Sequence, residues 1–69
     1  MYLNEHHIDY LASQAVTAYE LNCSWNDTYW TIYEIILEDY GFKPKKSLML
    51  LIIKQANLKW IARSVAVKN

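Results

Sequence analysis

The stretch KPKKSLMLLIIKQANLKWIARSVAV, residues 43–67, decides the fold of this chain. Its centre, Leu48–Ile53, is apolar at every position, which is typical of the central element of a small core. A buried strand is the alternative, but Leu and Met favour helix and no turn residue follows Pro44. We therefore predict a helix from near Pro44, which suits the first helical position, to about Val65. The segment Ser64–Val67 could instead be extended, because Val favours strands.

A second helix is predicted from Ser24 to about Tyr40. Ser24 with Asp27 three residues later resembles a capping box, and Gly41 can adopt the left-handed conformation that ends a helix. Two adjacent apolar stripes follow the helical period: Trp25, Tyr29, Ile32, Ile36 and Tyr40, and beside them Trp30, Tyr33 and Leu37. Together they cover an arc of roughly 160°, whereas burial on one side requires about 100°. This helix must therefore contact two neighbours, or one neighbour and an outside partner.

A third amphipathic helix is predicted at the start of the chain, from Asn4 to about Leu21. Asn4 is suited to cap its N-terminus, and Glu5 lies in the first turn, where the helix dipole favours an acid. The apolar residues recur at steps of three and four: Ile8, Leu11, Ala12, Ala15, Ala18 and Tyr19. The turn to the next helix is predicted at Asn22, Cys23 and Ser24.

The length of the chain limits its stability. A chain of 69 residues forms one domain, residues 1–69, and buries only about 60% of the surface that it exposes when unfolded. Cys23 is the only cysteine, so no disulfide can form within the chain, and no Cys/His cluster has zinc spacing. Self-association or binding to another protein is then the expected support. The sequence predicts an all-α fold, a compact three-helix domain that self-association could complete.

The composition also predicts where the chain resides. One Gly, one Pro and 54% hydrophobic residues indicate a packed domain rather than a disordered tail. The longest apolar run, Leu48–Ile53, is far shorter than the ~18 residues of a membrane span. No basic segment followed by an apolar stretch marks a signal peptide. We expect no membrane association and, because a lone cysteine suits a reducing compartment, a cytoplasmic location.

The charges divide the chain into an acidic and a basic half. All seven acidic residues lie in the first 39 positions and all seven basic residues lie from position 43 onward. Glu38 and Asp39 end one predicted helix and Lys45 and Lys46 begin the next, each on the side that the helix dipole disfavours. We expect the two pairs to neutralise each other across the turn. The alternative is an anion-attracting site made by the lysines and the helix start.

The candidates for chemistry do not combine into a site. His6 and His7 point about 100° apart on a helix, and neither has a metal-binding residue four positions on, so we interpret them as surface residues. Cys23 precedes a helix start, where a thiol can be reactive, but no catalytic signature surrounds it. We expect it to be buried or half-buried in a turn. We predict a non-enzyme with no metal, no cofactor and no small-molecule substrate.

The aromatic residues indicate a protein-binding surface. Six Tyr and three Trp stand against one Phe, and amphipathic aromatic residues are enriched at protein interfaces. Trp25, Tyr29 and Tyr19 are expected in the core. The predicted function is protein–protein interaction, as a small inhibitor or adaptor that binds a protein partner or a second copy in a homodimer. The predicted contact residues are Tyr10, Trp30, Tyr33, Leu37, Lys45, Lys46, Lys59 and Arg63.

The alternative function is a small regulator that binds nucleic acid. Residues 14–31 have the spacing of a helix-turn-helix, although Asn22 stands where Gly is expected and Thr28 where an aliphatic residue is expected. The second helix of this segment carries acids and no Lys or Arg, so phosphates would repel it. Nucleic acid would have to bind the basic C-terminal half, whose charges spread around the predicted helix.

Overall fold

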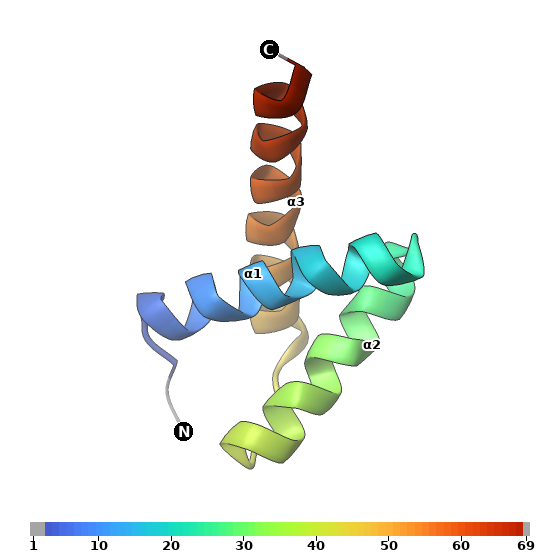
Figure 1. The fold of residues 1–69 in the computed structure, drawn as a ribbon. Coiled ribbons are helices and arrows are strands. Elements are labelled where there is room, and N and C mark those ends of the chain that lie inside the picture. The colour runs from blue at the N-terminus through green and yellow to red at the C-terminus, as the bar shows by residue number, and fades with distance from the viewer. Residues whose placement is uncertain (1–2, 69) are drawn as a thin grey trace.

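The computed structural model describes residues 3–68, and the side chains of residues 3–66. Its elements are α1 (Glu5–Asn22), α2 (Trp25–Ile35), the π-helical turn η1 (Ile36–Tyr40) and α3 (Lys46–Lys68). Figure 1 shows α1 crossing the N-terminal half of α3, α2 returning beside it, and the C-terminal half of α3 extending past both. No strand occurs in residues 3–68, so the predicted all-α fold of three helices is confirmed.

Within the described residues, no helix combines the length and the apolar character needed to cross a membrane.

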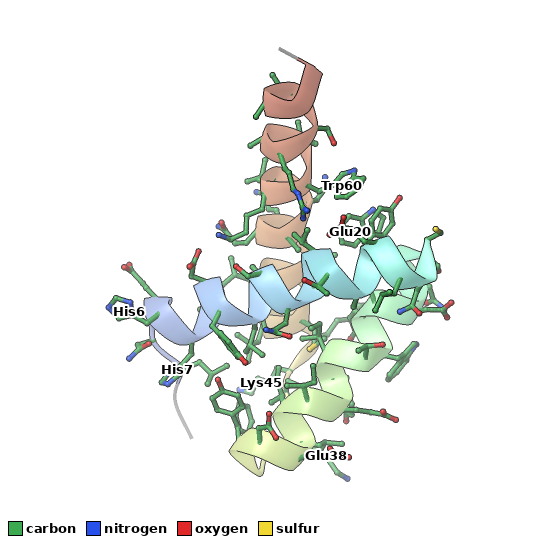
Figure 2. All side chains as sticks on the ribbon, viewed as in Figure 1. His6, His7, Glu20, Glu38, Lys45 and Trp60 are labelled. Atoms are coloured by element: carbon green, nitrogen blue, oxygen red, sulfur yellow. The ribbon has the colours of Figure 1, made fainter. Side chains whose placement is uncertain are left out.

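Local signals fix the start of α1. The Asn4 side chain accepts a hydrogen bond from the His7 amide at 3.0 Å, as predicted for an N-cap. The His7 ring accepts in return from the Asn4 amide at 3.3 Å, which completes an unpredicted capping box. The same ring lies edge-on to Tyr40 at 5.5 Å, so His7 also links α1 to the end of η1. Figure 2 shows His7 on the side of α1 that is turned toward η1.

Cys23, in the turn between α1 and α2, differs from its prediction. Cys23 adopts the left-handed conformation, φ 55°, and its amide donates to the Tyr19 carbonyl at 2.8 Å. The thiol is exposed, so the expectation of a buried or half-buried cysteine is wrong: the C-cap position directs the side chain to solvent. Ser24 caps α2 by accepting from the Asp27 amide at 3.3 Å, as predicted. The return bond of a capping box, from the Ser24 amide to the Asp27 side chain, is absent among the described residues, so that part of the prediction is wrong.

The second helix does not stay α-helical to its predicted end. Its last turn, η1, widens to a π-helix and is closed by the Gly41 amide, which donates to the Ile36 carbonyl at 3.1 Å. Gly41 has φ 74°, so the predicted left-handed glycine is confirmed.

The bounds of α3 differ from the prediction at both ends. The helix begins at Lys46 instead of Pro44, because the first helical hydrogen bond runs from the Met49 amide to the Lys45 carbonyl. It continues to Lys68, so the extended alternative for Ser64–Val67 is wrong.

The core lies where the three helices meet. Its largest fully buried side chains are Leu11 from α1, Ile32 and Ile36 from the second helical segment, and Met49 and Ile52 from α3. Thr28 is also fully buried, and its hydroxyl donates to the Ser24 carbonyl at 2.8 Å. The apolar face predicted for the first helix is confirmed, since Leu11, Ala12, Ala15 and Ala18 are buried.

One part of the predicted core is wrong. Leu50 and Leu51 are 52% and 41% exposed, although we expected Leu48–Ile53 to be buried on all sides. α1 and α2 pack against one side of α3 only, where Met49 and Ile52 lie. A helix that is apolar all round therefore keeps an uncovered apolar face here.

The interface between α1 and α3 carries the ion pairs. Lys59 contacts Asp9 at 2.7 Å and Arg63 contacts Glu20 at 2.8 Å. The neutralisation expected between the acids at 38–39 and the lysines at 45–46 is absent from the ion pairs of residues 3–66. The acidic and basic halves of the sequence instead pair across the helix crossing.

Candidate protein-binding surface

A shallow groove, largely open to solvent, runs between α2 and α3. It consists of two adjoining hollows, of about 400 and 530 Å³, which share Trp25 and Ile53 as lining residues. We call it the α2–α3 groove. Its α2 side is lined by Trp25, Asn26, Tyr29 and Trp30, and its α3 side by Lys46, Leu50, Ile53, Lys54 and Asn57.

The α2 wall of the groove is a series of packed aromatic rings. Tyr29 and Trp30 lie edge to face at 5.0 Å, and Trp30 and Tyr33 do so at 5.4 Å. Trp25 stacks on Tyr19 of α1 at 4.0 Å, and Tyr19 lies edge-on to Trp60 of α3 at 5.3 Å. The wall is thus anchored to both other helices at its Trp25 end, whereas Trp30 is 53% exposed. Such edge-to-face and offset pairs hold rings in defined orientations.

The charge of the groove is entirely positive. Lys46 and Lys54 are the charged side chains among its lining residues, and neither forms an ion pair with a described residue. Two other basic residues of α3, Lys59 and Arg63, face α1 and form ion pairs with its acidic residues. The groove is therefore apolar and aromatic with two uncompensated cations.

The contact residues predicted from the sequence do not lie on one surface. Trp30 and Lys46 line the α2–α3 groove, and Tyr33 is half-buried with its ring against that of Trp30. Leu37 is half-buried on η1, and Tyr10 is 55% exposed on α1. The remaining three, Lys45, Lys59 and Arg63, lie elsewhere: Lys45 lines a separate hollow with Phe42 and Leu48, and the other two pair with acids of α1.

Sequence reasoning missed most of the α3 side of the groove. Leu50, Lys54 and Asn57 lie three or four positions apart and so share one helical face. The sequence contains that spacing, but it did not identify Leu50 as a surface residue. Leu50 belongs to the uninterrupted apolar run Leu48–Ile53, every residue of which was expected to be buried.

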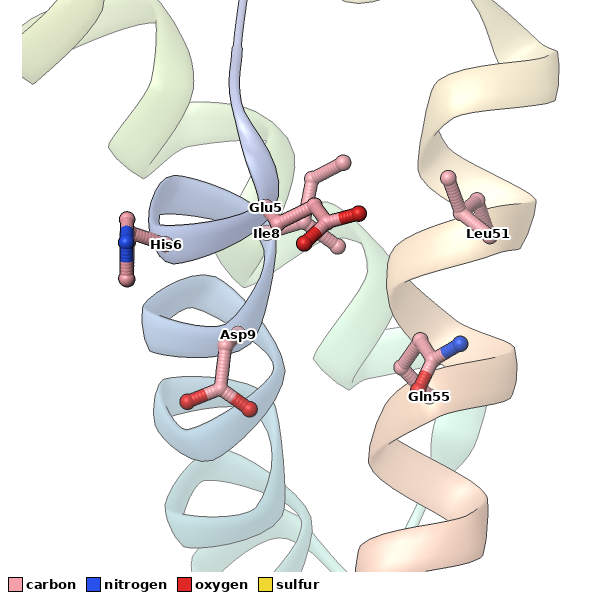
Figure 3. A pocket seen from close by; sticks show the side chains of 6 residues that line it. All are labelled: Glu5, His6, Ile8, Asp9, Leu51 and Gln55. Atoms are coloured by element: carbon pink, nitrogen blue, oxygen red, sulfur yellow. The ribbon is translucent and has the colours of Figure 1, made fainter.

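Another hollow, of about 470 Å³, lies between the start of α1 and α3. Figure 3 shows Glu5 and Asp9 on the α1 side and Leu51 and Gln55 on the α3 side, with His6 directed away. Asp9 already binds Lys59. In the part of the chain that the structure describes, no three His, Cys, Asp or Glu side chains gather closely enough to hold a metal ion.

Comparison with protein-family models, with curated proteins and with solved structures gives no match for this chain.

Proposed function

We propose that this chain is a protein-binding domain whose α2–α3 groove receives an amphipathic helix of a partner protein, one with acidic side chains beside its apolar stripe. The observation that carries the proposal is the composition of the groove: an apolar floor, an aromatic wall and lysines as its charged groups. A chain that binds in this way without chemistry of its own acts as an inhibitor or an adaptor.

Trp30 supports the proposal through its exposure and its fixed position. Half of this large side chain faces solvent, although two neighbouring rings already restrict it. A restricted ring loses little conformational entropy on binding, and buried Trp residues are frequent hot spots of interfaces. Leu50, 52% exposed, offers further apolar area across the groove.

The lysines define the chemistry of the occupant. Because Lys46 and Lys54 have no acidic partner among the described residues, an acid on the bound helix would gain an interaction without breaking one. Complementary charge also accelerates the encounter and disfavours basic partners.

The α3 side of the groove is long enough for a short helix. From Lys46 to Asn57 the α3 wall is about 16 Å long, room for roughly three helical turns. Helices bound in grooves between helices contact them through residues spaced three, four and seven apart.

Site-specific photocrosslinking tests the proposal. A photoreactive residue replaces Asn26, exposed on the groove rim, or Ser13, exposed on α1, and crosslinked proteins are identified in cells that produce the chain. We expect a protein crosslinked from position 26 and not from position 13. Its binding is then measured with both proteins purified.

Two matched aromatic variants decide whether the groove is the contact. Trp30 and Tyr10 are equally exposed, but they lie on different surfaces. Trp30→Ala should weaken binding at least about 30-fold, as loss of a hot spot of about 2 kcal/mol does, whereas Tyr10→Ala should leave it unchanged. Circular dichroism checks that both variants keep their helicity. Equal effects of the two substitutions would contradict the proposed groove.

A further inference from the structure

His7 takes part in contacts that join the start of α1 to the end of η1. Its ring accepts a hydrogen bond from the Asn4 amide at 3.3 Å, and the Asn4 side chain accepts one from the His7 amide at 3.0 Å. The same ring lies edge-on to Tyr40, the last residue of η1, at 5.5 Å. His7 is half-buried between these contacts. One imidazole therefore closes the capping box of α1 and contacts the neighbouring segment.

The bond between the ring and the Asn4 amide requires a neutral imidazole. The acceptor is Nδ1 of His7, which accepts a hydrogen bond only while it carries no proton. The usual residues at this position of a capping box are Glu and Gln, which accept through oxygen atoms. Imidazole differs from them because it takes up a proton near about pH 6.5. A capping box that is closed by His is therefore sensitive to pH in the range where the protein stays folded.

A positive charge on His7 has no ion-pair partner in the part of the chain that the structure describes. The charged or titratable side chains that flank His7 on α1, or flank Tyr40 on η1 and after it, are all exposed: Glu5, His6, Glu38, Asp39 and Lys43. Exposed charges that are not in contact are screened by water and salt. The free amides in the first turn of α1 carry partial positive charge, so the helix dipole also disfavours a cation there. The folded arrangement therefore favours the neutral ring.

The same capping box holds Leu3 in the core. Leu3 precedes the Asn4 cap, is 8% exposed and belongs to the core cluster, against which Ile8 also packs. Leu3 and Ile8 occupy the two positions of a hydrophobic staple, which fixes the angle at which the chain enters a helix. Asn4 between them has an extended backbone, with φ −90° and ψ 179°. Loss of the bond between Asn4 and the His7 ring therefore loosens the attachment of Leu3.

We propose that His7 is a pH-sensitive latch for the segment Leu3–His7. A proton taken up from solvent by Nδ1 turns this atom from an acceptor into a donor, so the Asn4 amide loses its partner, the capping box opens and Leu3 leaves the core. The rest of α1 stays packed through its buried apolar face. The unfolded chain takes up the same proton without losing a bond. The stability that the latch supplies is therefore present above the titration range of the ring and is lost as the pH falls through it.

The latch does not depend on the proposed α2–α3 groove. Leu3, His7 and Tyr40 are not among the residues that line the groove. Variants at position 7 therefore test the latch by itself, and its failure would leave the proposed function untouched.

NMR spectroscopy of the intact chain from about pH 7.5 to about pH 5 tests the latch. As the His7 ring titrates, the methyl resonances of Leu3 should move toward their positions in the unfolded chain, whereas those of the fully buried Ile52 should stay in place. Urea denaturation should show that the latch accounts for a rise of about fivefold in the unfolding equilibrium constant, the size of one lost helix cap. Leu3 resonances that stay in place while the ring titrates would overturn the proposal.

Three variants separate the latch from other effects of acid. His7→Gln keeps an acceptor that does not titrate, so it should abolish the response of Leu3 and remove the fivefold contribution. His7→Phe keeps an aromatic ring beside Tyr40 without an acceptor, so the Leu3 resonances should lie at their acidic positions at every pH. His6→Gln, at the exposed neighbouring histidine, should respond as the parent does. Circular dichroism checks that all three keep their helicity. A response of His7→Gln equal to that of the parent would overturn the proposal.

Discussion

The two sides on which α3 meets its neighbours are built differently. Against α1, the contact is extensive, and its rim is closed by ion pairs of Asp9 with Lys59 and Glu20 with Arg63. Against α2, the contact is limited, and the wall facing α3 consists of aromatic rings without an acid among the groove residues. The basic side chains of α3 that face α1 therefore have acidic partners, whereas those that line the groove have none among the described residues. The unsatisfied side is where a partner would gain most.

The largest expected effect is a difference in stability between substitutions on the buried side of α3 and on its groove side. Ile52→Ala removes a fully buried side chain and should lower the free energy of unfolding by about 2–5 kcal/mol. Leu50→Ala, two residues away on the groove wall, should cost less than about 1 kcal/mol because its side chain is already half in solvent. Urea denaturation followed by circular dichroism measures both. Similar losses would mean that the groove is closed in solution.

A smaller effect is expected from the ion pairs of the closed side. A double-mutant cycle of Asp9→Asn and Lys59→Met should give a coupling of about 0.2–1 kcal/mol, because both side chains remain partly exposed. The coupling should fall as salt is added. Lys54→Met should change stability by less than about 0.5 kcal/mol at any salt concentration, since Lys54 has no partner to lose among the described residues. A large loss in that variant would reveal an ion pair in the groove.

A smaller effect on stability is expected when an acid is added at the rim of the groove. Asn26→Glu places a carboxylate in the first turn of α2, where the helix dipole should raise the free energy of unfolding by about 0.3–0.5 kcal/mol. The same carboxylate lies on the rim that Lys46 lines, so it should weaken binding of the acidic partner helix several-fold. Thermal denaturation and a binding titration measure the two effects. Tighter binding of the partner would contradict the charge argument.

The smallest expected effect concerns nucleic acid. Two of the basic residues that the alternative function requires, Lys59 and Arg63, already pair with acids of α1. We therefore expect little binding to a random DNA duplex, measured by fluorescence anisotropy across a salt series. Binding with a steep salt dependence would favour the nucleic-acid-binding alternative, because phosphate contacts release counterions.

Features that depend on neighbouring residues could be predicted from the sequence. Asn4, Ser24 and Gly41 act within a few positions of themselves, and each has the predicted capping role. The three helices and the buried face of α1 follow from hydrophobic periodicity, which reports the local environment of each residue in turn.

Features that depend on how the helices cross could not be predicted. Leu50 and Leu51 resemble the buried Ile52 in sequence, and the placement of α1 and α2 alone determines which of them is covered. The pairing of Asp9 with Lys59 joins residues far apart in the chain. The expected pairing at the turn between η1 and α3 rested on closeness in sequence, which does not guarantee contact across a left-handed Gly41 and a buried Pro44. The candidate site belongs to this second group. Only Trp30 and Lys46 of its lining were predicted as contact residues, whereas Trp25 and Tyr29 were expected in the core and instead line the groove.

Charge reversal in the groove tests the central claim most directly. Once the partner is purified, its dissociation constant is measured for the parent chain, for Lys46→Glu with Lys54→Glu, and for Lys43→Glu with Lys45→Glu. The second double variant changes the net charge equally, but its lysines line a different hollow. Our account predicts that reversal in the groove weakens binding at least about 30-fold, as loss of two charge-assisted contacts does, and that the control changes it only a few-fold. Equal losses in the two double variants would contradict the groove as the binding site.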